Sequence, residues 1–265
     1  MNKLLCLVFV FALLGCSPKP PCGLEWRYPM SVSMPGSGTV YVKWATPSAV
    51  NGLDQKTVSI WRKHGDLTDD GTIWYLVGSG TNETFYVIFP TGATQKIELL
   101  VDASGSPGQW RSTNNVVTST ATWYMITVTY DRSSLSNDPI FYVNGSSVAI
   151  TELLAPTGTI DTGTNSDLYI GDPGATYNPN GLVADLRVYN TIMSAADILA
   201  LYNAGAFSPS YDTNLVFHAP LTNATNLGGS AFNGYTLTSS TKLIDRINCA
   251  QGTPSGSPTG SSTNP

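Results

Sequence analysis

Carboxylate side chains gather in one short turn-like stretch of this sequence. The segment "HGDLTDDGT" brings Asp66, Asp69 and Asp70 close together along the chain. Carboxylate oxygens are hard ligands of the kind that Ca²⁺ prefers, so these three residues form a candidate metal site. The spacing is not that of an EF-hand loop, and an acidic turn that is only solvated is the alternative. Ca²⁺ is therefore a candidate cofactor, and no other cofactor is indicated.

Two further segments mix aromatic, amide and charged side chains with turn residues. These are "SGSPGQWRST" and "GDPGATYNPNG". Aromatic faces contact the C–H surfaces of sugars, and amide or carboxylate groups bind sugar hydroxyls. We therefore predict carbohydrate-binding loops formed by Trp110, Arg111, Asp172, Tyr177, Asn178 and Asn180. In the alternative interpretation Trp110 covers an edge of the core and the asparagines cap turns.

Composition limits the classes of function. The chain has 265 residues, 12% of them charged, and a net charge of −5. Gly and Pro are abundant, as in turn-rich extracellular β proteins. The sequence has no cluster of Lys and Arg, so we expect no nucleic-acid partner.

Strand-like segments with turn signals between them recur from residue 39 onward. Examples are "TVYVKWAT", "TVSIWRK", "TFYVIF", "TWYMITVTYD", "DLYIG" and "LVFHAPL". Asn144 and Gly145 stand between two such runs, which is the strongest short signal for a hairpin turn. Many short strands with this spacing predict an all-β sandwich of two sheets.

One helix interrupts this pattern, over residues 194–203. Ser194 is a suitable N-cap, Asp197 follows in the first turn, and Gly205 suits the C-terminal cap. Ile198, Leu201 and Tyr202 fall on one face, which we expect to pack on the sandwich because so short a helix is not stable alone. We therefore assign the helix a structural role.

The order of motifs resembles the concanavalin A-like lectin/glucanase superfamily, in its laminin-G-like and pentraxin-like branch. The resemblance lies in Trp123–Asp131, Val143–Gly145, Tyr169–Gly171, Asp185–Asn190 and Met193–Tyr202. It implies a two-sheet antiparallel jelly-roll sandwich, with the one short helix directly after the "DLRVYN" strand. Calcium held by loop carboxylates is common in that family. The "LVFHAPL" strand normally opens such a domain but here follows the helix, which implies either a circularly shifted edge or a C-terminal extension of the sheet.

The resemblance does not extend to catalysis. Members that hydrolyse β-glucans carry E-x-D-x-x-E on one strand, which places two glutamates on one sheet face. The four glutamates here are Glu25, Glu83, Glu98 and Glu152, and no two of them lie in that motif. The two histidines, His64 and His218, lack the spacing of metal ligands. We therefore predict that the protein is not an enzyme; a glycan hydrolase built from distant carboxylates is the less favoured alternative.

The N-terminus predicts export. Lys3 precedes an apolar stretch that is too short to span a bilayer, and "LLGC" then resembles the bacterial lipoprotein signal. The resemblance implies cleavage before Cys16 and lipidation of that cysteine, so the only membrane contact is an N-terminal lipid anchor. An ordinary secretory signal is the alternative. Two cysteines of the domain then remain, and we predict a disulfide between Cys22 and Cys249.

The predicted organisation follows from these signals. Residues 1–15 are a signal peptide, 16–38 a tether and lead-in segment, 39–249 the sandwich with its C-terminal strands, and 250–265 a disordered Gly/Ser/Thr/Pro-rich tail. The predicted function is a non-catalytic carbohydrate-binding or adhesion module, displayed as an outer-membrane or cell-surface lipoprotein. Its partner is a glycan or a cell-surface protein. The alternative is a structural or interaction protein, such as a decoration of a virion surface.

Overall fold

The fold is described from a computed structural model. It describes residues 31–35, 41–44, 48–68, 71–78, 85–90, 92, 95–160, 166–171, 180–206, 211, 213–219, 221, 235–236, 243–244, 251–255 and 259–261. The signal peptide, Cys16, Cys22 and Cys249 lie outside these residues, so the cleavage, lipidation and disulfide stay predictions.

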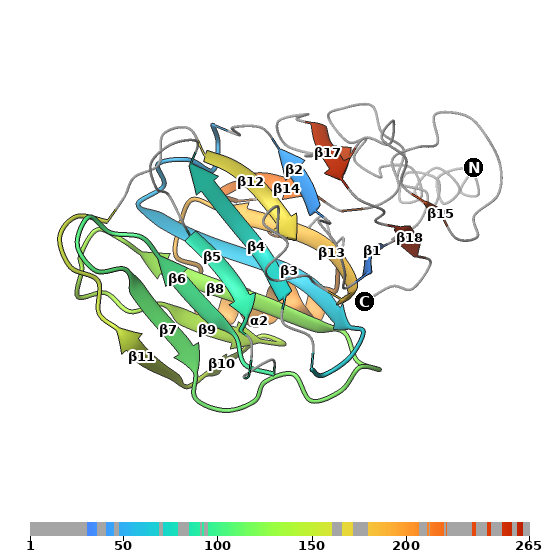
Figure 1. Ribbon diagram of the computed structural model, residues 1–265, viewed down its shortest axis with the longest axis horizontal. Coiled ribbons are helices and arrows are strands. Elements are labelled where there is room, and N and C mark those ends of the chain that lie inside the picture. Colours follow the sequence, from blue (N-terminus) through green and yellow to red (C-terminus); the bar gives the residue numbers. More distant parts are fainter. Residues whose placement is uncertain are drawn as a thin grey trace, which may run out of the picture.

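Two antiparallel sheets pack face to face, as the sequence predicts (Figure 1). Sheet A contains, in spatial order, β10 (Ser146–Val148), β9 (Ile140–Val143), β8 (Tyr124–Asp131), β3 (Gln55–His64), β13 (Asn180–Tyr189), β1 (Ser31–Pro35), β18 (Thr259–Ser261) and β15 (Tyr235–Thr236), with β14 (Leu215–Ala219) beside β13. Sheet B contains β11 (Ile150–Leu154), β7 (Gly108–Ser112), β6 (Glu98–Val101), β5 (Phe85–Phe89), β4 (Gly71–Gly78), β12 (Ser166–Gly171), β2 (Tyr41–Trp44), β17 (Gln251–Ser255) and β16 (Leu243–Ile244). The prediction of a two-sheet jelly-roll sandwich is confirmed.

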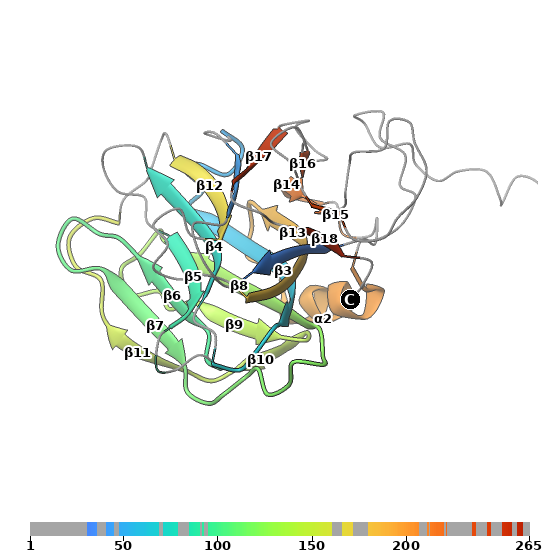
Figure 2. The ribbon, with the colours of Figure 1, turned by 45° about the vertical axis from the view of Figure 1, so that its right-hand side comes forward.

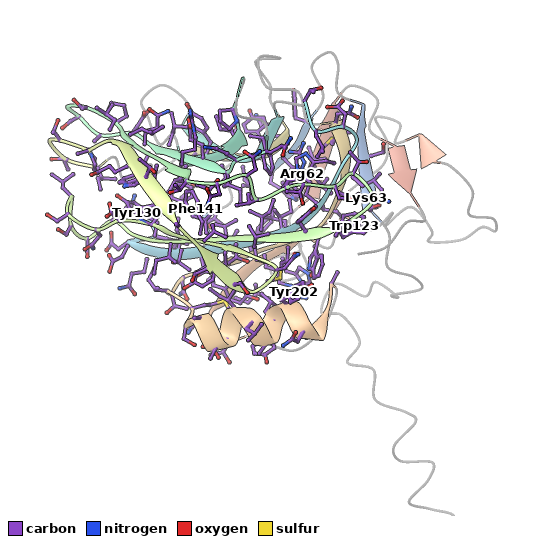
Figure 3. All side chains as sticks on the ribbon, turned by 90° about the horizontal axis from the view of Figure 1, so that it is seen from below. Arg62, Lys63, Trp123, Tyr130, Phe141 and Tyr202 are labelled. Atoms are coloured by element: carbon purple, nitrogen blue, oxygen red, sulfur yellow. The ribbon has the colours of Figure 1, made fainter. Side chains whose placement is uncertain are left out.

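Alternate residues of each strand form the core between the sheets. Val42, Trp44, Leu168 and Ile170 point inward from β2 and β12 and are fully buried. Tyr130 and Phe141 lie between the sheets from the other side (Figure 3). The intervening residues of these strands lie on the outer faces, because side chains alternate along a strand.

Helix α2 (Ala195–Ala204) covers the outer face of sheet A, on the side away from sheet B (Figures 2 and 3). The Ser194 hydroxyl accepts a hydrogen bond from the Asp197 amide at 3.2 Å, which confirms the predicted N-cap. Ile198 and Leu201 are buried, and the Tyr202 ring stacks on Trp61 with 5.6 Å between centroids. The helix therefore packs by the face that the sequence predicts.

The predicted hairpin at Asn144 and Gly145 connects β9 to β10. Both residues have positive φ, 51° and 79°, as a tight hairpin turn requires. A Cβ on Gly145 would also lie 2.9 Å from Leu199 Cδ1 of α2. Glycine therefore allows both the turn and the close approach of the helix.

The predicted domain limits need correction at both ends. Residues 31–35, predicted as part of the tether, form β1 in sheet A and pair with β13. Residues 251–255 and 259–261, predicted as disordered tail, form β17 beside β2 and β18 beside β1. Strand β1 contributes Met34 to the core, whereas β17 and β18 are polar and are placed by backbone pairing, which is why composition misled the prediction there.

The "LVFHAPL" segment forms β14. Strand β14 pairs with the second half of β13, and β1 pairs with the first half of β13. The strand therefore extends sheet A after the helix. In the part of the chain that the structure describes, no helix is long and apolar enough to cross a membrane.

Candidate carbohydrate-binding face and end loops

Two of the predicted site segments meet at one end of the sandwich. Asp66 follows β3 and Asn180 opens β13, and these two strands are paired. The Asn180 side-chain amide donates to Asp66 Oδ2 at 2.8 Å, and the Gly65 amide donates to the Asn180 carbonyl at 3.0 Å. Asp66 is predicted as a metal ligand and Asn180 as a sugar ligand. The two side chains therefore lie in contact at the same end of the sandwich.

The Asp66 carboxylate organises its own turn. Its Oδ1 accepts hydrogen bonds from the amide and the hydroxyl of Thr68, at 2.9 and 3.0 Å. With Asn180 on Oδ2, both oxygens are engaged within the protein. The described residues contain no group of three or more His, Cys, Asp or Glu that could hold a metal ion. Asp69 and Asp70 lie outside the described residues, so the calcium site stays a prediction.

Gly181, the residue after Asn180, allows β13 to approach β3 closely. Gly181 has φ of 126°, and a Cβ at this position would lie 2.1 Å from the Lys63 carbonyl oxygen. Any larger residue would push β13 away from β3 and break the Asn180 contact to Asp66. The other predicted residues of this segment, Asp172, Tyr177 and Asn178, lie outside the described residues.

The position of Trp110 corrects the prediction of a binding loop around it. Trp110 lies on β7, its exposed fraction is 0%, and its ring packs against Tyr130 with 5.6 Å between centroids. Its Nε1 donates to Asp138 Oδ1 at 2.7 Å. With both faces covered, the indole is a core residue and has no surface for a sugar. The glycine and proline before it are typical of a loop, but β7 begins at Gly108.

Arg111 also lies on β7 rather than in a loop, but its side chain points to the outer face of sheet B. Arg111 Nε lies 2.5 Å from Glu98 Oε2, and the Gln109 amide donates to Glu98 Oε1 at 2.7 Å. The Glu98 side chain is 3% exposed and that of Arg111 is 30% exposed. Glu98 therefore holds the side chains of Arg111 and Gln109 on the outer face of sheet B.

A second polar group on the same face joins β2 to β12. Tyr41 and Tyr169 make an edge-to-face contact with centroids 5.3 Å apart. Lys43 Nζ lies 2.5 Å from Asp167 Oδ2 and 5.6 Å from the Tyr169 ring centroid. The hydrogen bond to Asp167 raises the pKa of Lys43 above its usual value, so the ammonium stays charged. We call these four residues, Tyr41, Lys43, Asp167 and Tyr169, the β2–β12 cluster.

The β2–β12 cluster lies on the face that the helix leaves open. Helix α2 packs on sheet A, and the described part of the chain places no helix on the outer face of sheet B (Figures 1 and 3). Strand β12 ends at Gly171, opposite Tyr41, and the chain re-enters sheet A at Asn180. Gly171, the last described residue before the predicted loop, is therefore the cross-strand partner of Tyr41.

Sequence reasoning missed this cluster, although a signal was present. "TVYVKW" and "DLYIG" alternate tyrosine, lysine and aspartate with apolar residues. That alternation separates the two faces of each strand, but only the sheet order shows that the two polar faces adjoin.

A third ionic cluster, formed by Asp185, Arg187 and His218, is buried. His218 Nε2 lies 2.6 Å from Asp185 Oδ1, and Arg187 contacts the other oxygen of Asp185 at 3.1 Å. The three side chains are at most 2% exposed, so a dissolved ligand cannot reach them. We therefore assign these three residues a structural role, in which they hold β13 and β14 together.

The family model described as "Concanavalin A-like lectin/glucanases superfamily" matches residues 36–199. The chain belongs to this superfamily. The resemblance predicted from the sequence motifs is thus confirmed. No curated protein matches the chain.

Three solved structures illustrate what this superfamily member is similar to. A candidate carbohydrate-binding protein from Bacteroides ovatus is 17% identical with a TM-score of 0.58, and the match covers 87% of this chain and 60% of that one. A pentraxin from Limulus polyphemus is 14% identical, with a TM-score of 0.46 and coverage of 68% and 85%. Domain 4 of an extracellular arabinanase from Geobacillus stearothermophilus, in complex with arabinotriose, is 16% identical, with a TM-score of 0.46 and coverage of 68% and 89%.

Proposed function

We propose that this protein is a non-catalytic carbohydrate-binding module that binds glycan on the outer face of sheet B. The observation that carries the proposal is the β2–β12 cluster, which places a half-buried tyrosine beside an ammonium–carboxylate pair on the sheet face opposite the one that α2 covers. Aromatic rings contact the apolar faces of sugars, and charged donors and acceptors bind hydroxyls. The Bacteroides ovatus protein of the same fold supports this class of ligand.

The absence of the E-x-D-x-x-E motif supports a binding role rather than hydrolysis. Glu98, the glutamate that the structure describes on this face, is 3% exposed and accepts hydrogen bonds from Gln109 and Arg111. A carboxylate held in this way is engaged in positioning its neighbours. We further propose that the lipid on Cys16 displays the module at the cell surface, where it serves adhesion to glycans.

A glycan array with the purified domain tests the proposal, with and without EDTA. For a glycan that binds, Tyr41→Ala should weaken binding by about 1–3 kcal/mol, because a truncated aromatic contact at the centre of a site costs this much. The control is Leu199→Ala, which removes an exposed side chain from α2 on the other side of the sandwich and should leave affinity unchanged.

Two outcomes would contradict the proposal. One is the absence of binding to every glycan of the array by a folded protein. The other is equal binding by the wild type and the Tyr41→Ala variant. Loss of binding in EDTA would support the calcium prediction, and retained binding would argue against it.

A further inference from the structure

A pocket of about 450 Å³ opens at the end of the sandwich opposite the Asp66 turn. Its wall includes Asp54, which directly precedes β3, whereas Asp66 follows the other end of that strand. The ten residues of β3 separate the two ends by about 30 Å. No residue of the β2–β12 cluster lines the pocket. The pocket is therefore a separate place, and its volume suits a small molecule.

Two of the described lining residues, Arg132 and Asp54, carry charges of opposite sign. Arg132 Nε lies 3.4 Å from Asp54 Oδ1, which is longer than the roughly 2.8 Å of a close charge-assisted hydrogen bond. The Arg132 side chain is 4% exposed, so the protein encloses this cation, whereas the Asp54 side chain is 76% exposed. A guanidinium has five N–H donors, so Arg132 can serve a ligand in addition to its protein partners.

The wall that carries these charges is fixed by hydrogen bonds. The Arg132 amide donates to the Asp54 carbonyl at 2.9 Å. Asp131 Oδ1 accepts from the Ser133 amide at 2.9 Å, and the Asn137 side chain donates to the Asp131 carbonyl at 3.0 Å. The segment that carries Arg132 and Ser133 is thus held from both sides.

The facing wall, formed by residues 158–160, is fixed in the same way. The Thr159 amide donates to Ser104 Oγ at 2.9 Å, and the Ser104 amide donates to the Thr159 carbonyl at 2.9 Å. Gly158 has φ of 86°, and a Cβ there would lie 2.5 Å from Ser104 Oγ. Both walls are therefore formed before a ligand arrives, which lowers the ordering cost of binding.

The rest of the described lining offers aliphatic surface and hydroxyl groups. Leu135 is 37% exposed and Ile160 is 7% exposed, and Ser133, Ser134 and Thr159 provide the hydroxyls. None of the described lining residues is aromatic, and aromatic rings are what sugar faces pack on. The lining therefore favours a ligand with an aliphatic part over a sugar.

The two charges restrict the ligand further. A simple anion on Arg132 would meet the negative charge of Asp54, and a simple cation on Asp54 would meet the positive charge of Arg132. A molecule that carries both charges can lie antiparallel to this pair and satisfy each of them. An α-amino acid has its ammonium and carboxylate on adjacent carbon atoms, at a spacing similar to that of paired ions.

We propose that this pocket binds a zwitterionic α-amino acid with an apolar side chain. The ligand carboxylate binds Arg132, its ammonium binds Asp54, and its side chain packs on Leu135 and Ile160. The site is independent of the proposed glycan site, so one can be present without the other.

Calorimetry with leucine, isoleucine, methionine and phenylalanine tests the proposal. For leucine, two analogues separate the charges: isocaproate lacks the ammonium and isoamylamine lacks the carboxylate. Each analogue should bind at least about tenfold more weakly than leucine, because each loses one charge-assisted contact.

Asp54→Asn is the decisive variant, because so exposed a side chain can be changed without loss of the fold. It should weaken leucine binding about tenfold and leave isocaproate binding equal or tighter, since the repelling charge is removed. Glu152→Gln is the matched control. It removes one exposed carboxylate from β11, outside the pocket, and should leave both affinities unchanged.

Leu135→Ala tests the apolar wall and should reduce the preference for leucine over alanine. The proposal is overturned if the folded protein binds none of the four amino acids, or if leucine and isocaproate bind equally well. Equal leucine binding by the wild type and Asp54→Asn would overturn it too, and so would tighter binding of glucose than of leucine at this pocket. Glycan binding by Asp54→Asn should match the wild type, and its loss would show that the two sites are not separate.

Discussion

His64 is a buried ionisable residue at the end of β3, beneath the turn that contains Asp66. Its ring is 2% exposed and contacts Phe89 edge to face, with 4.4 Å between centroids. Burial, together with the positive charge of Arg62, lowers the pKa of His64 to about 2. The native protein therefore keeps this imidazole neutral at every ordinary pH.

The unfolded chain, in contrast, protonates His64 near pH 6.5. Below that pH the unfolded state binds a proton that the native state does not, so stability falls as pH falls from about 6.5 towards 2. At pH 5 this residue should reduce the free energy of unfolding by about 2 kcal/mol. Urea unfolding of the wild type and of His64→Leu, each at pH 7 and pH 5, measures the effect.

The His64→Leu variant should lose about 2 kcal/mol less stability between the two pH values than the wild type does. All other ionisable groups are the same in the two proteins, so their contributions cancel in this comparison. The same pH-dependent loss in both proteins would show that His64 does not contribute to acid sensitivity.

At the scale of single residues, sequence reasoning missed the polar cluster on the outer face of sheet B. Asp66 and Asn180 were predicted as parts of two different sites, and the hydrogen bond between them shows that they are neighbours. Trp110 was misplaced because Gly and Pro before it look like a loop, while the long-range pairing of β7 with β6 and β11 determines its strand. Tyr41 and Tyr169 are far apart along the chain, so only the pairing of β2 with β12 brings them together.

At the scale of elements, the helix and the hairpin were predictable because their signals are local. Ser194, Asp197 and Gly205 specify the ends of α2 from within a few residues, and Asn144 with Gly145 specifies the turn. Strands β1, β17 and β18 have no such signal. Their polar residues pair by backbone hydrogen bonds with strands that are distant in sequence.

Helix α2 should contribute to stability and not to binding. Leu201 is 2% exposed and packs in the cluster between the helix and sheet A. Leu201→Ala should lower the free energy of unfolding by about 2–5 kcal/mol, from lost burial and from the cavity that remains. Affinity for glycan per folded molecule should stay the same, because the proposed site lies on the other sheet.

Leu199→Ala in the same helix provides the matched control, because Leu199 is 44% exposed and its truncation should cost little. Denaturant unfolding and calorimetry on the same preparations separate the two effects. A Leu201→Ala variant of normal stability, or one that stays folded but loses glycan affinity, would contradict the structural role of α2.

At the scale of the whole molecule, the lipid anchor that we propose at Cys16 would determine where the module acts. If Cys16 is the lipidated residue, Cys16→Ser should remove the lipid mass and move the protein from the membrane fraction to the soluble fraction. Mass spectrometry of the mature chain and fractionation of cells measure both changes. Cys6→Ser is the control, because cleavage before Cys16 discards Cys6 with the signal peptide. An intact N-terminus, or a cleavage site elsewhere in the wild type, would show that the lipoprotein prediction is wrong.

The strands that close the two sheets come from the end of the chain. β18 pairs with β1, so Ser31 stands opposite Ser261, and β17 pairs with β2 in the other sheet. Contacts between residues so far apart in sequence form slowly, because the long loop between them must close first. A chain still being synthesised lacks these partners and leaves the edges of β1 and β2 open. If the protein is exported, as we propose, and crosses its membrane as an extended chain, this order of pairing delays the completed sandwich until β17 and β18 have emerged on the far side.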